Sequence, residues 1–201
     1  QVFVVSTGEP TGTTVTERLR IASDGSLSTP TLGTSNVRFG VNAGNSIASG
    51  GNYNTVVGDE AGTALTTGDY NVALGYNAGQ GVTTGQYNTL IGGLAGDALT
   101  TPNHNVAVGY SALTADTQGT GSTAVGRFAL GSQNFTTPTD VYNVGVGFNA
   151  GVSVTTGTIN TLIGALAGDA LTTGNSNVAV GYNALSGDTK GDRSTAIGMQ
   201  A

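Results

Sequence analysis

The chain has 201 residues, among them 34 Gly, no Cys and no Trp, and only 9% of its residues are charged. The net charge of −6 is carried with only six Lys and Arg, which argues against a nucleic-acid partner because neutralising phosphates requires basic side chains. No apolar run approaches the length of a membrane span and no signal peptide is visible, so membrane insertion is not expected.

The first 33 residues differ in pattern from the rest of the chain. Leu19 and Ile21 alternate with polar residues and are followed by Asp24 and Gly25, which is typical of a β-hairpin with a primed two-residue turn. We therefore expect a β-hairpin module over residues 1–33 and a second region over residues 34–201.

The second region consists of a short unit that occurs ten times. Each unit begins with Asn or Ser, continues with a short apolar segment and Gly, and has Ala three residues after that Gly. Successive units are 17 or 18 residues apart, except for one step of 21. A fixed short period indicates a solenoid, in which each unit buries its apolar side by stacking on its neighbours. The first residues of the units are Asn36, Asn54, Asn71, Asn88, Asn105, Ser122, Asn143, Asn160, Asn177 and Ser194.

Each unit predicts one coil of the solenoid. If its first residue is position zero, β-branched residues dominate positions one and three, while position two is mostly small or aliphatic. This pattern predicts a strand with two apolar faces, of which one lines the coil and the other requires a second subunit. Gly at position four predicts positive φ or close backbone approach, and Ala at position seven predicts a buried slot. Thr at position twelve and Gly or Pro at position fourteen predict a second corner, so we expect two short strands per coil.

The fold class that follows is all-β, a parallel β-roll or β-solenoid with 17-residue coils. Stacking ten coils at about 4.8 Å each gives an array on the order of 45–50 Å long. The side-chain amides at position zero are expected to hydrogen-bond along the stack as a structural ladder. This ladder comprises Asn54, Asn71, Asn88, Asn105, Asn143, Asn160 and Asn177.

One coil is longer than the others and carries a loop over residues 131–142. Insertions in solenoids emerge as loops on one edge, and loops commonly carry contacts. We predict Phe135, Pro138 and Asp140 of this loop as contact residues, with a harmless insertion as the alternative.

His104 is the one candidate for histidine-dependent catalysis. It occupies the position where other coils have tyrosine, which predicts a ring stacked in a column beside Tyr87. A nucleophile and an orienting acid with suitable spacing are missing, so we expect no enzyme.

Acidic residues and glycine-rich segments recur along the array and are possible ligand sites. The acidic residues lack the nonapeptide cadence of calcium-binding β-rolls, so solvated corners are expected and metal binding is not. The glycines match no phosphate-binding loop, and no cofactor is expected. The acidic residues considered are Asp97, Asp116, Asp169 and Asp188.

Regular Thr spacing suggests ice binding as a further alternative. Adjacent pairs such as Thr66 and Thr67 point to opposite faces, however, which favours a role in turns and ladders.

The segments NVAVGYNALSGDTKG and NTLIGALAGDALTTG resemble the head repeats of YadA-type trimeric autotransporter adhesins, and a slightly longer related repeat is common in bacteriophage tail-fibre-like proteins. The resemblance covers roughly residues 36–201. It implies a left-handed β-roll assembled as a homotrimer, with the position-two face toward the threefold axis. The segment TERLRIASDGSLST is similar to a strand–turn–strand element of phage tail fibres, which favours the phage.

These observations predict a structural and adhesive fibre segment of a bacteriophage tail fibre that mediates host attachment. A bacterial trimeric surface adhesin or extracellular filament is the alternative. The expected partners are two further copies of the chain and a host-cell surface glycan or protein. The expected location is the virion tail fibre or the cell surface, and Gln1 suggests a fragment of a longer fibre.

Overall fold

The computed structural model describes residues 3–8, 15–21, 27–28 and 32–201, with side chains described from Leu32 onward. Near the N-terminus, strand β1 (Phe3–Gly8) pairs antiparallel with β2 (Val15–Ile21), and β2 pairs antiparallel with β3 (Leu27–Ser28). The module is therefore a three-stranded antiparallel sheet, with one strand more than the predicted hairpin. The expected turn at Asp24 and Gly25 lies outside the described residues.

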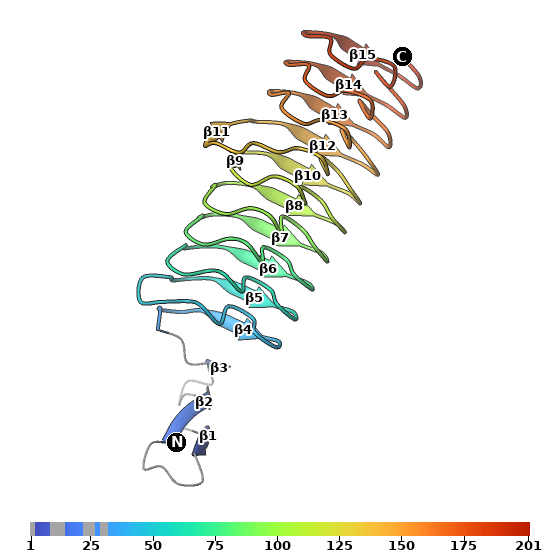
Figure 1. Cartoon of the computed structure of the whole chain (residues 1–201). Coiled ribbons are helices and arrows are strands. Elements are labelled where there is room, and N and C mark those ends of the chain that lie inside the picture. Colours follow the sequence, from blue (N-terminus) through green and yellow to red (C-terminus); the bar gives the residue numbers. More distant parts are fainter. Residues whose placement is uncertain (1–2, 9–14, 22–26, 29–31) are drawn as a thin grey trace.

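The rest of the chain is a parallel β-solenoid, as the repeat predicted (Figure 1). Each coil contributes one three-residue strand to a ten-stranded parallel sheet, and equal positions of neighbouring units pair in register. The pairing offset is 17 residues between β5 and β6 and 21 residues between β10 and β12, so the period of the sequence is the period of the coil. The strands are β4 (Val37–Phe39), β5 (Thr55–Val57), β6 (Val72–Leu74), β7 (Thr89–Ile91), β8 (Val106–Val108), β10 (Thr123–Val125), β12 (Val144–Val146), β13 (Thr161–Ile163), β14 (Val178–Val180) and β15 (Thr195–Ile197).

The position-two side chains point into the coil. Val56 and Ala107 are 0% exposed, whereas outward-facing Leu74 of position three is 42% exposed. The placement of the position-two face toward a threefold axis, which the resemblance implied, is therefore wrong. Only the small or aliphatic residues of position two fit the narrow interior, so the β-branched residues of positions one and three form the outer face of the sheet.

The corner after each strand explains the Gly that every unit has at position four. Gly58 has a φ of +133°, and a Cβ added there would lie 2.4 Å from the carbonyl oxygen of Gly75 in the next coil. Both predicted reasons for glycine, positive φ and close backbone approach, therefore apply together.

The second side of the coil is not a regular strand, so the expectation of two strands per coil is wrong for most coils. It is instead held by single backbone hydrogen bonds between neighbouring coils, such as Thr66 N to Thr83 O at 2.9 Å and Thr83 N to Thr100 O at 2.8 Å. The long coil is the exception, because β9 (Gly119–Thr120) pairs in parallel with β11 (Thr139–Asp140).

The interior of each coil is filled by an aliphatic side chain that comes either from position eight or from position eleven. Coils with Gly at position eight have an aliphatic residue at position eleven, as in Gly96 and Leu99, and a Cβ on Gly96 would lie 2.8 Å from Leu99 Cδ1. Coils with a buried leucine at position eight have a polar residue at position eleven, as in Leu113 and Asp116. One aliphatic side chain per coil therefore fills the same space from either position.

Within the described part of the chain, no helix has the length and apolar character needed to cross a membrane.

Candidate functional site

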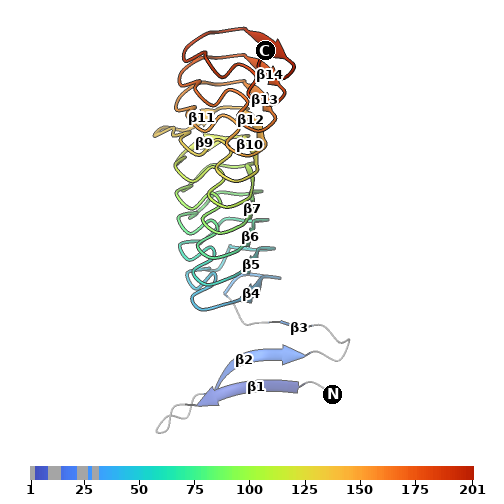
Figure 2. The same ribbon diagram turned by 90° about the vertical axis from the view of Figure 1, so that its right-hand side faces the viewer.

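The predicted contact loop lies on one edge of the stack. In Figure 2 the long coil with β9 and β11 projects beyond the outline of its neighbours. Pro138 and Asp140 are exposed on this projection, but Phe135 is only 8% exposed. Its backbone carbonyl accepts a hydrogen bond from Thr117 Oγ1 at 2.8 Å. Phe135 is therefore an anchor at the base of the loop, and its prediction as a contact residue is wrong.

A buried polar cluster lies behind this loop. Asp116 and Gln133 are both 0% exposed, and Gln133 Nε2 donates to Asp116 Oδ2 at 2.6 Å. The backbone N–H groups of Gly119 and Phe135 donate to Asp116 Oδ1 at 3.0 and 3.1 Å. The carboxylate thus accepts three hydrogen bonds inside the protein, and the prediction of a solvated corner is wrong for Asp116.

The asparagines at position zero form a buried column along the stack. Asn71 is typical: its backbone N–H and its Nδ2 donate to Asn54 Oδ1 at 2.9 and 3.2 Å. Its Nδ2 also donates to the carbonyl of Gly85 across the coil at 2.8 Å. Each amide therefore joins the two sides of its own coil and joins that coil to its neighbour. These hydrogen bonds replace those that the buried amide would otherwise make with water.

The column is interrupted where Ser122 replaces asparagine, and Gln133 bridges the interruption. Gln133 Nε2 donates to Ser122 Oγ at 3.0 Å, and Asn143 Nδ2 donates to Gln133 Oε1 at 2.9 Å. Sequence reasoning missed Gln133. Its signal was a polar residue at position eleven of the long coil, the same coil whose first residue is serine.

At the position that precedes each unit, four consecutive coils carry an exposed column of rings. The rings of Tyr53, Tyr70, Tyr87 and His104 stack at centroid distances of 4.9, 5.1 and 5.2 Å, with interplanar angles of 12°, 5° and 13°. The predicted stacking of His104 on Tyr87 is confirmed. The stacking covers the ring faces and leaves the ring edges as the surface of this column.

The environment of Tyr70 within this column changes its acidity. Partial desolvation, the neighbouring phenols of Tyr53 and Tyr87, and the carboxylate of Asp69 all raise the pKa of the Tyr70 phenol above its ordinary value. Removing a proton there would place a negative charge between groups that disfavour it.

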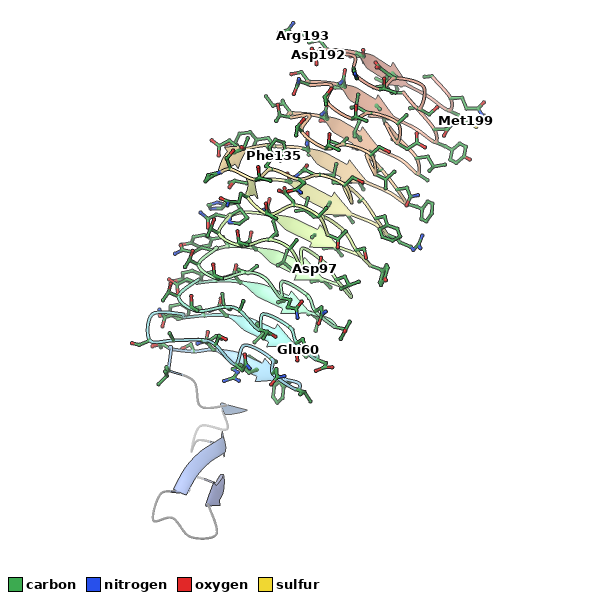
Figure 3. All side chains as sticks on the ribbon, viewed as in Figure 1. Glu60, Asp97, Phe135, Asp192, Arg193 and Met199 are labelled. Atoms are coloured by element: carbon green, nitrogen blue, oxygen red, sulfur yellow. The ribbon has the colours of Figure 1, made fainter. Side chains whose placement is uncertain are left out.

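A second exposed column, at position five, was missed by the sequence reasoning. We call it the position-five column. Figure 3 places Met199 of this column on one edge of the stack and Arg193, which precedes the last unit, on the opposite edge. The signal in the sequence was the alternation of aromatic and other residues at position five, from Tyr76 to Tyr182. The column comprises Val41, Asp59, Tyr76, Gly93, Tyr110, Arg127, Phe148, Ala165, Tyr182 and Met199.

The acidic residues do not gather into a metal site. Asp97 Oδ1 accepts a hydrogen bond from Thr114 Oγ1 at 2.6 Å, and Asp188 Oδ1 accepts the backbone N–H groups of Lys190 and Gly191 at 3.0 and 2.6 Å. No group of three or more His, Asp or Glu side chains that could hold a metal ion occurs among the described residues.

Family models, curated proteins and solved structures gave no match. The surfaces of the solenoid offer hydroxyls, aromatic rings and, in the middle of the array, the isolated guanidinium of Arg127.

Proposed function

We propose that the chain is a structural and adhesive segment of a homotrimeric fibre, and that this fibre is a bacteriophage tail fibre that mediates host attachment. The fold supports the structural part of the proposal. Backbone, asparagine and threonine hydrogen bonds all run between successive coils, so the stack is cross-linked along its axis. A rod of this kind holds a binding surface at a distance from its base.

The observation that carries the trimer is the outer face of the ten-stranded sheet. Positions one and three present β-branched and aliphatic side chains along its whole length, and Leu74 and Ile163 are 42% and 38% exposed. Soluble monomers rarely expose a contiguous apolar face of this extent. We therefore assign this face, and not the position-two face, to the contact between the three copies.

Light scattering on the purified chain tests the assembly. The expected mass is about three times the 19.8 kDa of one chain. Val108→Lys, on the outer face of the sheet, is expected to give monomers with unchanged circular dichroism, because three buried ammonium groups would meet at the contact. Thr84→Lys is the matched control, since Thr84 is exposed on the second side of the coil. A wild-type chain that is monomeric at high concentration contradicts the proposal.

The resemblance of the repeat to trimeric adhesin heads also favours a second candidate, a bacterial surface adhesin. Both candidates share the assembly and the adhesive role, and they differ in the genes around the coding sequence. Neighbouring genes for tail proteins are expected for the phage fibre, and their absence would favour the adhesin.

A further inference from the structure

The position-five column carries an aromatic residue in every second coil. Tyr76, Tyr110, Phe148 and Tyr182 are 57%, 51%, 45% and 52% exposed. Two coils correspond to a spacing of about 9.6 Å along the axis. The four rings therefore form an evenly spaced row on one edge of the stack.

This row differs from the stacked column on the opposite edge. There, rings occur in the four consecutive coils from Tyr53 to His104, about 5 Å apart, and cover one another, as Tyr70 and Tyr87 do at 5.1 Å. In the position-five column, Gly93 and Ala165 lie in the coils between aromatic residues. Rings spaced two coils apart are too distant to stack on each other, so no ring of the row covers another. Tyr110 meets Phe128 edge to face at 5.7 Å and Arg127 lies over Phe148, whereas Tyr76 and Tyr182 make no ring contact among the described residues.

One cation lies inside this row. Arg127 is the only Lys or Arg between residues 39 and 189, and its exposed side chain lies in the coil between Tyr110 and Phe148. Its guanidinium is 4.5 Å from the ring centroid of Phe128 and 5.6 Å from that of Phe148. The column's one carboxylate, Asp59, is four coils away. The rings thus hold a guanidinium at the surface with its hydrogen-bond donors free for an anion.

We propose that the position-five column binds an acidic polysaccharide that lies extended along the fibre axis. A pyranose presents a face of C–H groups that packs on an aromatic ring. In an extended β-1,4-linked chain every second sugar has the same orientation, and this two-sugar repeat is close in length to two coils. Arg127 then pairs with a uronate carboxylate in the fork geometry that suits guanidinium groups.

This inference rests on the adhesive part of the proposed function and names the ligand class. A regular row favours a periodic ligand over a folded protein surface, whose contacts are irregular. The isolated Arg127 favours an acidic polymer over a neutral one. Position five follows the corner glycine and lies outside the three-residue strands, whose outward side chains form the trimer contact assigned above.

Affinity electrophoresis of the full chain in gels that contain polymannuronate tests the inference, with hydroxyethylcellulose as the neutral comparison. Polymannuronate is expected to retard the wild type, and hydroxyethylcellulose to retard it less. Tyr110→Ala combined with Phe148→Ala, and separately Arg127→Gln, are each expected to weaken binding about tenfold, which corresponds to the loss of one strong contact. Added salt should weaken wild-type binding and leave the residual binding of Arg127→Gln nearly unchanged.

Tyr53→Ala on the opposite edge is the matched control and is expected to bind like the wild type. Light scattering on every variant separates the two proposals. If a monomeric wild-type chain is retarded by polymannuronate, the proposed trimer is wrong and the polysaccharide inference is supported. No retardation by polymannuronate, or equal weakening by Tyr53→Ala, overturns the inference. A fall in particle mass for the Tyr110→Ala, Phe148→Ala variant also overturns it, because the column would then be a contact between copies.

Discussion

Gln133 Nε2 donates a 2.6 Å hydrogen bond to the buried carboxylate of Asp116 in the preceding coil. Both residues stand at position eleven of their coils, where six other coils have an aliphatic residue of the hydrophobic core and the coil of Asn177 has Asp188. Gln133 belongs to the longest coil of the array, which begins with Ser122 in place of the asparagine of the ladder. The polar pair therefore lets a loop leave the stack while every buried group beside the opening keeps a partner.

Asp116→Ala is expected to destabilise the array. The substitution removes the acceptor of the N–H groups of Gly119 and Phe135 and one of the two acceptors of Gln133 Nε2. Each buried unpaired N–H costs about 1–3 kcal/mol. We expect a loss of at least about 3 kcal/mol in the free energy of unfolding by urea, together with faster proteolysis within the loop. Asp140→Ala in the same loop is the control, and an equal loss there would show that the cluster has no special role.

Gly109→Ala is expected to strain the corner between coils. Gly109 has a φ of +134°, and an added Cβ would lie 2.6 Å from the carbonyl oxygen of Gly126. Backbone strain alone costs about 1–3 kcal/mol, and the clash with the next coil adds to it.

Gly187→Ala provides the matched comparison, because a Cβ at Gly187 would meet no atom within 4 Å. Its stability should stay within about 1 kcal/mol of the wild type. Thermal unfolding of both variants measures the difference, and two equal midpoints would contradict the role assigned to the position-four glycines.

The sequence was sufficient to predict the fold because the solenoid repeats its constraints in every coil. A residue type that recurs at one position in all ten units, such as the glycine represented by Gly58, has one structural cause that acts everywhere. The two faces of the strand were harder to distinguish. Both Val56 inside and Val57 outside are apolar, so hydrophobicity alone does not say which face lines the coil. Size distinguishes the faces only in part, because alanine occupies position two in five of the ten units while Leu90 and Leu162 are also buried there.

The candidate surfaces were less predictable because they depend on departures from the repeat. Phe135 looked like an exposed loop residue, but a hydrogen bond to Asp116 in the previous coil holds its backbone inward. That contact joins residues 19 apart, which is not a multiple of the period. The row of Tyr76, Tyr110, Phe148 and Tyr182 has a period of two coils, which a comparison of single coils does not reveal.

Alkaline pH is expected to weaken the stacked column at Tyr70. An unfolded tyrosine has a pKa of about 10, and the pKa of Tyr70 is raised in the folded chain. A group with a raised pKa binds its proton more tightly when folded, so its contribution is complete below the unfolded pKa and is lost as the pH rises through the folded value. Tyr70→Phe should therefore lose less stability than the wild type between pH values of about 8 and 11. Urea midpoints at both pH values measure this, and parallel losses in the two proteins would rule it out.

No thermal hysteresis is expected from the purified chain. The position-twelve hydroxyls are used within the protein, as Thr66 Oγ1 donates to Thr83 O at 3.0 Å. The exposed Thr column represented by Thr84 is single and is interrupted by Gln118. Osmometry on the purified chain checks this expectation, and hysteresis that disappears in Thr84→Lys would restore ice binding as a function.

Among replacements of a ladder asparagine by leucine, which has a similar volume, Asn105→Leu is expected to lower the stability of the array most. Asn105 Oδ1 accepts the backbone N–H of Ser122 at 2.9 Å, and its Nδ2 donates to Gly119 O at 2.9 Å. Leucine fills the space but leaves both backbone groups buried without a partner, which costs about 2–6 kcal/mol in total. The damage should be greatest here because Ser122 lacks an amide of its own to compensate. Asn45→Leu, at an exposed asparagine, should leave the urea midpoint nearly unchanged. If the two variants unfold at the same urea concentration, the hydrogen bonds of the ladder do not contribute to the stability of the array.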